Sequence, residues 1–212
     1  YASLARSADI WMVDRLQYQV GADLTFEHLS SGDASSAGVI PSDSWLLPAS
    51  AYKSIAGVGQ ATRVAKFQAS LNLPRGTISY RPGARAPFGQ QSNDDEVPEV
   101  SLLLIDRLEF PNVVYWRRDF SPDSLGSLMN QLGANPNGLL VPRTVAERLP
   151  AGSEEELNID ISLDGVVHTI TFRIVGVFDY WPTMPQSSPL YVVGNMEYIE
   201  REIGGAFPHG IW

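Results

Sequence analysis

The chain has 212 residues, and 24 Asp and Glu against 15 Lys and Arg give it a formal net charge of −9 at pH 7. This balance argues against a nucleic-acid or anionic-lipid partner, because either requires clustered positive charge. The absence of cysteine excludes thiol catalysis, thiolate metal centres and disulfides. Hydrophobic residues make up 44% of the chain, which favours a folded body, but the longest aliphatic run, residues 102–105, is far shorter than the roughly 20 residues of a membrane span.

The first elements predicted along the chain are a helix and a strand. Residues 4–16 place apolar side chains at three- and four-residue spacing, which predicts an amphipathic helix whose stripe includes Leu4, Trp11, Met12 and Leu16. Residues 20–26 then alternate apolar and polar side chains, which predicts a half-buried strand.

The next part of the chain is rich in turn-forming residues. Residues 30–44 are predicted to be a solvated loop, followed by a short helix ending at Gly57 and a strand over residues 61–69. The proline-rich residues 74–98 are predicted to be a long connection with a short strand at residues 77–80.

The middle of the chain alternates strands and helices. Residues 100–105 form an apolar run typical of a buried strand. A helix over residues 122–132 is predicted to be capped by Ser121 and ended by Gly133. A strand at residues 138–141 is predicted to lead into a second helix of about two turns, because Thr144 and Glu147 have capping-box spacing.

The last part carries the clearest β signal. Residues 159–163 and 170–174 alternate on either side of Asp164-Gly165, which predicts a hairpin with a two-residue turn. A strand at residues 190–193 precedes a helix that Asn195 caps and Gly204 ends. Because strands and helices mix without regular alternation, the predicted class is α+β.

Candidate catalytic and metal-binding residues are few. No phosphate-binding loop or nucleophile elbow occurs, and Gly57-Val58-Gly59 is best interpreted as a helix stop and turn. His168 shares strand parity with buried positions and is predicted to be partly buried, whereas His28 and His209 are predicted to be solvated. Their spacing does not favour a zinc site, and no cofactor is predicted.

Acidic and aromatic clusters leave alternatives open. Residues 154–156 are predicted to be a solvated acidic loop, and residues 93–96 could hold a weak Ca²⁺ although they lack the EF-hand spacing. Tyr115, Trp116, Arg117 and Arg118 could stack on a sugar or a partner, but a core aromatic beside surface arginines is the simpler interpretation. Trp181 is predicted to pack against the core.

Several segments together follow the pattern of one family. These are residues 18–24 (YQVGADL), 55–64 (IAGVGQATRV), 139–149 (LLVPRTVAERL) and 172–178 (FRIVGVF). Their order resembles that of the extracytoplasmic domain, the MacB-like periplasmic core, of FtsX-like and MacB-like ABC transporter permeases. Order and spacing carry this resemblance, since each segment alone is unspecific.

The resemblance implies a domain organisation. Residues 1–17 would be a stalk helix continuing from a membrane helix, and the chain would be a piece of a longer protein. A discontinuous porter-like core would comprise residues 18–73 and 166–205, with an inserted α/β lobe at residues 74–165. Residues 206–212 would be a tail leading to further chain.

The resemblance also implies a function without catalysis. The domain would lie on the extracytoplasmic face of the cell membrane and couple ATP hydrolysis by a separate cytoplasmic ABC ATPase subunit to export, lipid or lipoprotein handling, or partner activation. Two permease subunits would pair, with Leu4, Trp11, Met12 and Leu16 as stalk-packing residues and Trp116, Arg117 and Arg118 facing a protein or lipid cargo. The alternatives are a secreted carbohydrate- or protein-binding module, which would expose Tyr115, Trp116 and Trp181 on one face, and a hydrolase using two carboxylates.

Overall fold

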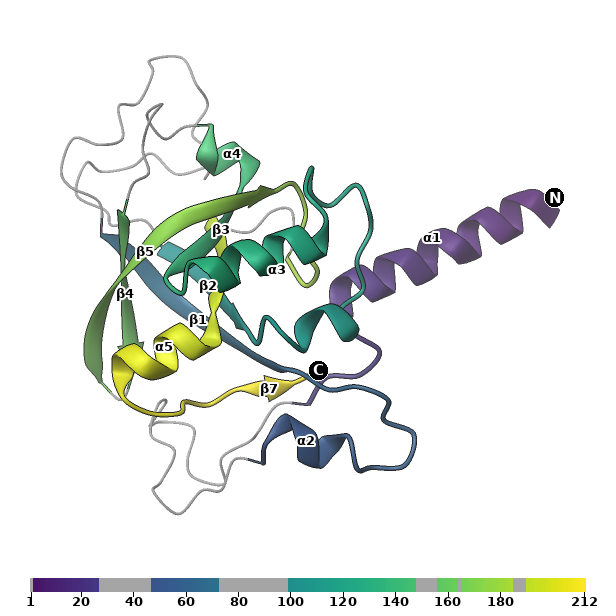
Figure 1. Ribbon diagram of the computed structural model, residues 1–212. Coiled ribbons are helices and arrows are strands. Elements are labelled where there is room, and N and C mark those ends of the chain that lie inside the picture. The colour runs from purple at the N-terminus through teal and green to yellow at the C-terminus, as the bar shows by residue number, and fades with distance from the viewer. Residues whose placement is uncertain (1, 27–46, 73–98, 148–155, 164, 185–189) are drawn as a thin grey trace.

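The computed structural model describes residues 2–26, 47–72, 99–147, 156–163, 165–184 and 190–212, and for residues 2–5 and 190 it describes the backbone alone. The described residues form helices and one sheet, so the predicted α+β class is confirmed (Figure 1). The helical elements are α1 (Ala2–Val20), α2 (Ala49–Tyr52), the 3-10 turn η1 (Phe110–Asn112), α3 (Leu125–Ala134), α4 (Arg143–Ala146) and α5 (Met196–Ile203). The strands are β1 (Arg63–Asn72), β2 (Glu99–Ile105), β3 (Gly138–Pro142), β4 (Glu156–Leu163), β5 (Val166–Phe178), β6 (Leu190–Asn195) and β7 (Gly210–Ile211).

The sheet closes on itself. Its strand order is β2-β6-β3-β5-β4-β1-β7, and β1 also pairs with β2, so the order returns to its first strand. The β2–β6 and β3–β5 pairs are parallel, and the other pairs are antiparallel. Closure satisfies backbone groups that an open sheet would leave at its edges.

Two apolar clusters lie on opposite faces of this sheet. Leu102 and Leu104 of β2 belong to one cluster, with buried side chains of β4 and α5, while Leu103 and Ile105 belong to the other, with α3 and η1. Because β2 is buried on both faces, its sequence is a continuous apolar run. By contrast, buried and less buried residues alternate along β4, as expected for a strand with one buried face.

Helix α1 projects away from the sheet, as Figure 1 shows. Its 19 residues correspond to a rod of about 28 Å at 1.5 Å per residue. The helix predicted at residues 4–16 is therefore confirmed and extends further at both ends.

The strand predicted at residues 20–26 is wrong. Val20 belongs to α1, which ends where Gly21 adopts φ +82° and its N–H donates to the Gln17 carbonyl oxygen at 2.8 Å. Phe26 makes one isolated bridge, to Ile211. The alternating pattern is not sufficient for a strand, because a strand also requires a neighbouring strand that pairs with it along its length.

Two helix starts also differ from the prediction. Helix α3 begins at Leu125 and its cap is Ser124, whose Oγ accepts from the Ser127 N–H, while Ser121 instead donates its hydroxyl to the Val177 carbonyl oxygen. The predicted two-turn helix is α4, which has four residues, and Thr144 lies inside it and cannot cap it.

The hairpin turn and the helix cap and stop predicted in the last part of the chain are confirmed. Leu163 pairs with Val166 across the hairpin turn, where Gly165 adopts φ +74°. Asn195 caps α5 through its side chain, and Gly204 ends the helix in the left-handed conformation. Strands were also found where the patterns at residues 61–69, 100–105, 138–141 and 190–193 predicted them. The short helix predicted to end at Gly57 is α2, which instead ends at Tyr52, and Gly57 lies in the turn that follows.

The division into a core and an inserted lobe at residues 74–165 stays a prediction. Strands β2, β3 and β4 come from the expected lobe, yet they lie in the same sheet as β1, β5 and β6 from the expected core. The predictions for residues 30–44, 77–80 and 93–96 and for His28 fall outside the described residues.

Candidate functional site at the base of helix α1

The C-terminal end of α1 is fastened to the body by backbone and phenol hydrogen bonds. The Thr183 N–H donates to the Tyr18 carbonyl oxygen at 2.7 Å, and the Tyr115 N–H donates to the Gly21 carbonyl oxygen at 2.9 Å. The Tyr18 hydroxyl donates to the Met184 carbonyl oxygen at 2.8 Å. We call these contacts of Tyr18 and Gly21 the inner anchor.

Gly21 allows the close approach that the inner anchor requires. A Cβ built on it would lie 2.7 Å from the Thr183 methyl carbon and 2.7 Å from the Trp212 ring. Since its φ is also positive, any other residue would strain both the backbone and this contact.

A second attachment lies one turn earlier on α1, near the surface. The Asp14 carboxylate accepts from the Tyr115 hydroxyl on one oxygen and from Arg117 Nη1 on the other. Arg117 also donates from Nε and Nη2 to the two carboxylate oxygens of Asp119, at 2.9 and 2.7 Å. We call the contacts of Asp14 with Tyr115 and Arg117 the outer clamp.

Phe120 connects the two attachments. Its buried ring packs edge-on against Tyr18, with centroids 5.6 Å apart, and the Arg117 guanidinium carbon lies 5.7 Å from its centre. The Phe120 carbonyl oxygen accepts from the N–H groups of Asp179 and Tyr180, which fixes the loop that carries the ring. The aromatic ring therefore forms a support on which the last turns of α1 rest.

The electrostatics of the clamp follow from these hydrogen bonds. Donation from Arg117 holds the pKa of Asp119 below its usual value, and Asp119 raises the pKa of Arg117. Burial raises the pKa of Tyr115, and its hydrogen bond to Asp14 raises it further. Burial also raises the pKa of Tyr18. Asp119 is therefore held as a carboxylate and both phenols as neutral donors.

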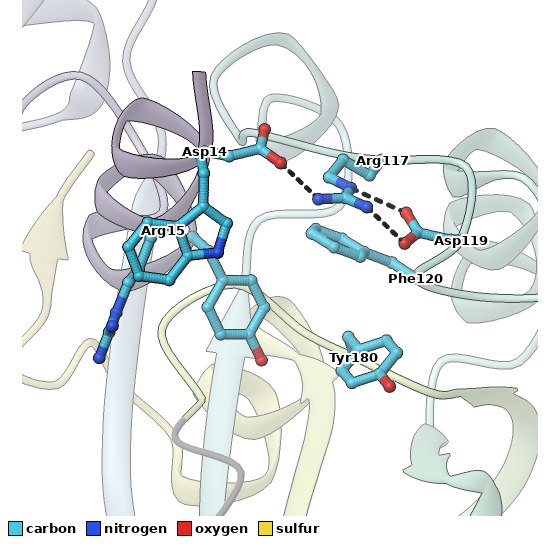
Figure 2. A pocket seen from close by; sticks show the side chains of 8 residues that line it. Asp14, Arg15, Arg117, Asp119, Phe120 and Tyr180 are labelled. Carbon is cyan, nitrogen blue, oxygen red and sulfur yellow. Dashed lines mark hydrogen bonds and ion pairs between the residues drawn. The ribbon is translucent and has the colours of Figure 1, made fainter. Parts of the chain in front are cut away.

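A pocket of about 270 Å³ lies between α1 and the body (Figure 2). One wall is a stripe of α1 and the other comes from the loops at Phe120 and Tyr180, and the lining residues are Trp11, Asp14, Arg15, Tyr18, Arg117, Asp119, Phe120 and Tyr180. Figure 2 shows Asp14 reaching across to Arg117. Among the described residues of this α1 stripe, only Asp14 forms an ion pair with the opposite wall.

The sequence analysis named part of this site. Trp116 is half-buried and packs edge-on against Trp181, with centroids 5.1 Å apart, while Arg117 and Arg118 are exposed, which matches a core aromatic beside surface arginines. Arg117 belongs to the outer clamp. That these three residues face a partner stays a prediction.

Three of the four predicted stalk-packing residues are more than half exposed in this chain. Trp11 is 61% exposed, Met12 56% and Leu16 53%. The side chain of Leu4 lies outside what the structure describes. Arg15 lies over the Trp11 ring, 5.3 Å from its centre. Packing of these side chains against a second helix stays a prediction.

Sequence reasoning missed Asp14, Tyr18 and Phe120. Asp14 and Tyr18 lie on the same stripe of α1 as Trp11. The sequence analysis used apolar residues alone to define helix faces, so it did not detect a stripe that also contains a carboxylate and a phenol. The partners lie 101 to 166 residues away along the chain, so no local pattern indicates the contacts.

The sugar-binding alternative required Tyr115, Trp116 and Trp181 on one exposed face. Trp181 is fully buried and stacks on Phe110, with centroids 5.8 Å apart. It packs into the core as the sequence analysis expected, so the three rings form no exposed platform.

The alternative of a hydrolase that uses two carboxylates does not match the arrangement of acidic residues in this pocket. Its two carboxylates, Asp14 and Asp119, both accept from Arg117. A glycosidase acid needs a raised pKa, whereas the pKa of Asp119 is lowered. Asp119 is therefore not arranged as a proton donor.

The remaining candidates are distributed over the molecule. His168 is half-buried as predicted, but His209 is only 8% exposed, which contradicts the prediction of a solvated tail. Its Nδ1 lies 3.0 Å from the Phe207 carbonyl oxygen, and the pairing of the adjacent strand β7 with β1 holds the C-terminal segment against the sheet. Within the described ranges, no group of three or more acidic or histidine side chains is placed to hold a metal ion.

Among the described residues, every helix is too short or too polar to cross a lipid bilayer.

Comparison with solved structures gives a likeness in fold. Neither a protein-family model nor a curated protein sequence matches the chain. The chain is similar to the crystal structure of the extracellular domain of the noncanonical ABC-type transporter YknZ from Gram-positive bacteria, with a TM-score of 0.46 and 12% identity. The alignment covers 88% of this chain and 80% of that one.

Proposed function

We propose that the chain is a non-catalytic extracytoplasmic domain of an FtsX-like or MacB-like ABC transporter permease, and that α1 is its stalk. The observation that carries the proposal is the form of α1, a projecting 19-residue helix fastened to the body at its C-terminal end by Asp14, Tyr18 and Gly21. The order of the four sequence segments described above supports the family.

The surface of α1 supports a stalk that packs in a larger assembly. Ile10, Trp11, Met12 and Val13 are consecutive and more than half exposed. Successive helix residues are separated by about 100°, so these four side chains surround the helix. An apolar band on all sides is typical of a helix that other helices cover. In the proposed transporter the stalk of a second permease subunit would cover it.

The proposed domain does mechanical work and no chemistry. ATP would be hydrolysed by a cytoplasmic ABC ATPase subunit, reached through membrane helices. The domain would take part because it contacts a protein or lipid cargo differently in two transporter states. Moving a two-state equilibrium from 1:99 to 99:1 requires about 5.5 kcal/mol, which a stiff helix can transmit and a flexible linker cannot.

The test interrupts the stalk in the natural gene product that contains this chain. Two glycines inserted after Arg6 should abolish coupling, so that transport falls while ATP hydrolysis continues. The matched control is the same insertion after Gly165, in the exposed turn between β4 and β5, which should leave both activities intact.

Undiminished transport after the Arg6 insertion would reject the stalk role. A natural gene product that is secreted without a membrane anchor and turns over a substrate unaided would reject the whole proposal. Labelling of an Arg6→Cys variant by a membrane-impermeant maleimide in intact cells gives an independent test of the extracytoplasmic location. The 212 residues contribute no other cysteine, and the same gene product without the substitution is the control for labelling elsewhere.

A further inference from the structure

We propose that the outer clamp is a latch, which opens and closes while the inner anchor stays formed, so that α1 has two positions relative to the body. The role of this latch in transport rests on the proposed function, but the latch itself is a property of the chain. The two attachments of α1 differ in burial and in the kind of contact.

The outer clamp is partly exposed at the surface, whereas the inner anchor is built into the body. The Asp14 and Arg117 side chains are 35% and 44% exposed. Exposed ion pairs contribute little stability, since water and salt screen them. The inner anchor uses main-chain hydrogen bonds and the buried residue Gly21, which packs against Trp212. The clamp is therefore the weaker attachment.

Asp119 lowers the cost of opening the clamp. It holds two of the guanidinium nitrogens of Arg117 and leaves Nη1 for Asp14. When Asp14 leaves, the Arg117 charge stays paired with Asp119 and stays over the Phe120 ring. Asp14 and the Tyr115 hydroxyl can then be hydrated, because both residues reach the surface. No buried charge is left without a partner in the open position.

The pocket gives α1 room to move. It separates the helix from the loops at Phe120 and Tyr180, so the walls are not in continuous contact along this stripe. Tyr18, which lies one turn after Asp14 on α1, remains packed on Phe120. Phe120 thus serves as the pivot, and the contact between Asp14 and Arg117 determines the helix position.

The experiment measures the position of α1 directly in the 212-residue chain. Because the chain lacks cysteine, Arg6→Cys on α1 and Asn130→Cys on α3 can carry two spin labels, and both positions are exposed. The distance distribution is recorded by pulsed dipolar spectroscopy for the wild-type clamp and for Asp14→Asn. The matched control is Asp9→Asn, which removes the same charge from an exposed position on the same helix.

We expect Asp14→Asn to increase the population of the second distance roughly two- to fivefold, the factor that corresponds to one exposed ion pair. Asp9→Asn should leave the distribution unchanged. Raising NaCl from about 0.1 to 1 M should move the wild-type distribution toward that of Asp14→Asn, because the screening length falls from about 10 to 3 Å.

An unchanged distribution in both Asp14→Asn and high salt would overturn the latch. The salt titration requires no substitution at the clamp, so it decides the matter even if Asp14→Asn folds poorly. Loss of all defined distances in Asp14→Asn, with the secondary structure intact by circular dichroism, would also overturn it, because the inner anchor would then not hold alone. These measurements need no membrane or ATPase, so failure of the stalk test in the transporter leaves their outcome unaffected.

Discussion

Replacing Gly21 with alanine should destabilise the chain by roughly 2–4 kcal/mol. The left-handed φ of +82° costs an L-residue about 1–2 kcal/mol. The added Cβ would lie 2.7 Å from both Thr183 and Trp212, and overpacking of this kind costs about 1–3 kcal/mol. A smaller term, about 0.4–1 kcal/mol, is recovered because alanine restricts the unfolded chain.

The matched control for Gly21→Ala is Gly204→Ala. Gly204 has φ +78°, close to that of Gly21, but no atom lies within 4 Å of its added Cβ. This control therefore carries the backbone cost without the contact cost, and we expect a loss of about 1 kcal/mol.

Urea denaturation followed by far-ultraviolet circular dichroism gives both free energies of unfolding. Near-ultraviolet circular dichroism reports on the packing of the aromatic side chains, Trp212 among them, and the spectrum should change in Gly21→Ala and stay constant in Gly204→Ala. Equal losses in the two variants would refute the reasoning, because the close approach at the base of α1 would then contribute nothing.

Three further outcomes follow from burial and ionisation. Leu128→Ala should cost about 2–5 kcal/mol of unfolding free energy because Leu128 is a fully buried residue of α3, whereas Leu108→Ala, at a position 66% exposed, should stay within about 0.5 kcal/mol, and urea denaturation compares the two. Thr62→Val should raise the free energy of unfolding by about 1 kcal/mol, since the buried Thr62 hydroxyl has no hydrogen-bond partner among the described residues, and a loss would contradict this reasoning. The pKa values of Tyr18 and Tyr115 are raised above the ordinary value of 10.0, so their contribution is present below pH 10.0 and lost as the pH rises through the folded-state pKa values. Denaturation midpoints measured across this range should therefore fall, and they should fall less in a variant with both tyrosines changed to phenylalanine.

Local signals in the sequence determined several elements of the fold. The Asn195 cap, the stop at Gly204 and the turn at Gly165 each depend on residues within one or two turns of chain, and all three are present in the structure. The apolar run of β2 likewise predicted a buried strand, and the structure buries it on both faces. Such signals act over short distances because caps, turns and periodicity are properties of neighbouring residues.

Local patterns failed where the tertiary structure supplies the partner. The alternation at residues 20–26 resembles a strand, but Gly21 ends α1 against Thr183 and Trp212, and Phe26 makes a single bridge. His209 seemed solvated from its glycine-containing surroundings, yet the pairing of β7 with β1 buries it.

The sequence by itself determined the α+β class, the sites of most strands and helices, and the helical nature of α1. Only the tertiary structure decided that the sheet closes through β1 and β2 and that Asp14 meets Arg117 at the base of α1. The reason is physical: a cap or a turn is satisfied within a few residues, whereas sheet closure and the outer clamp join groups that are distant in the chain and meet only after the core has packed.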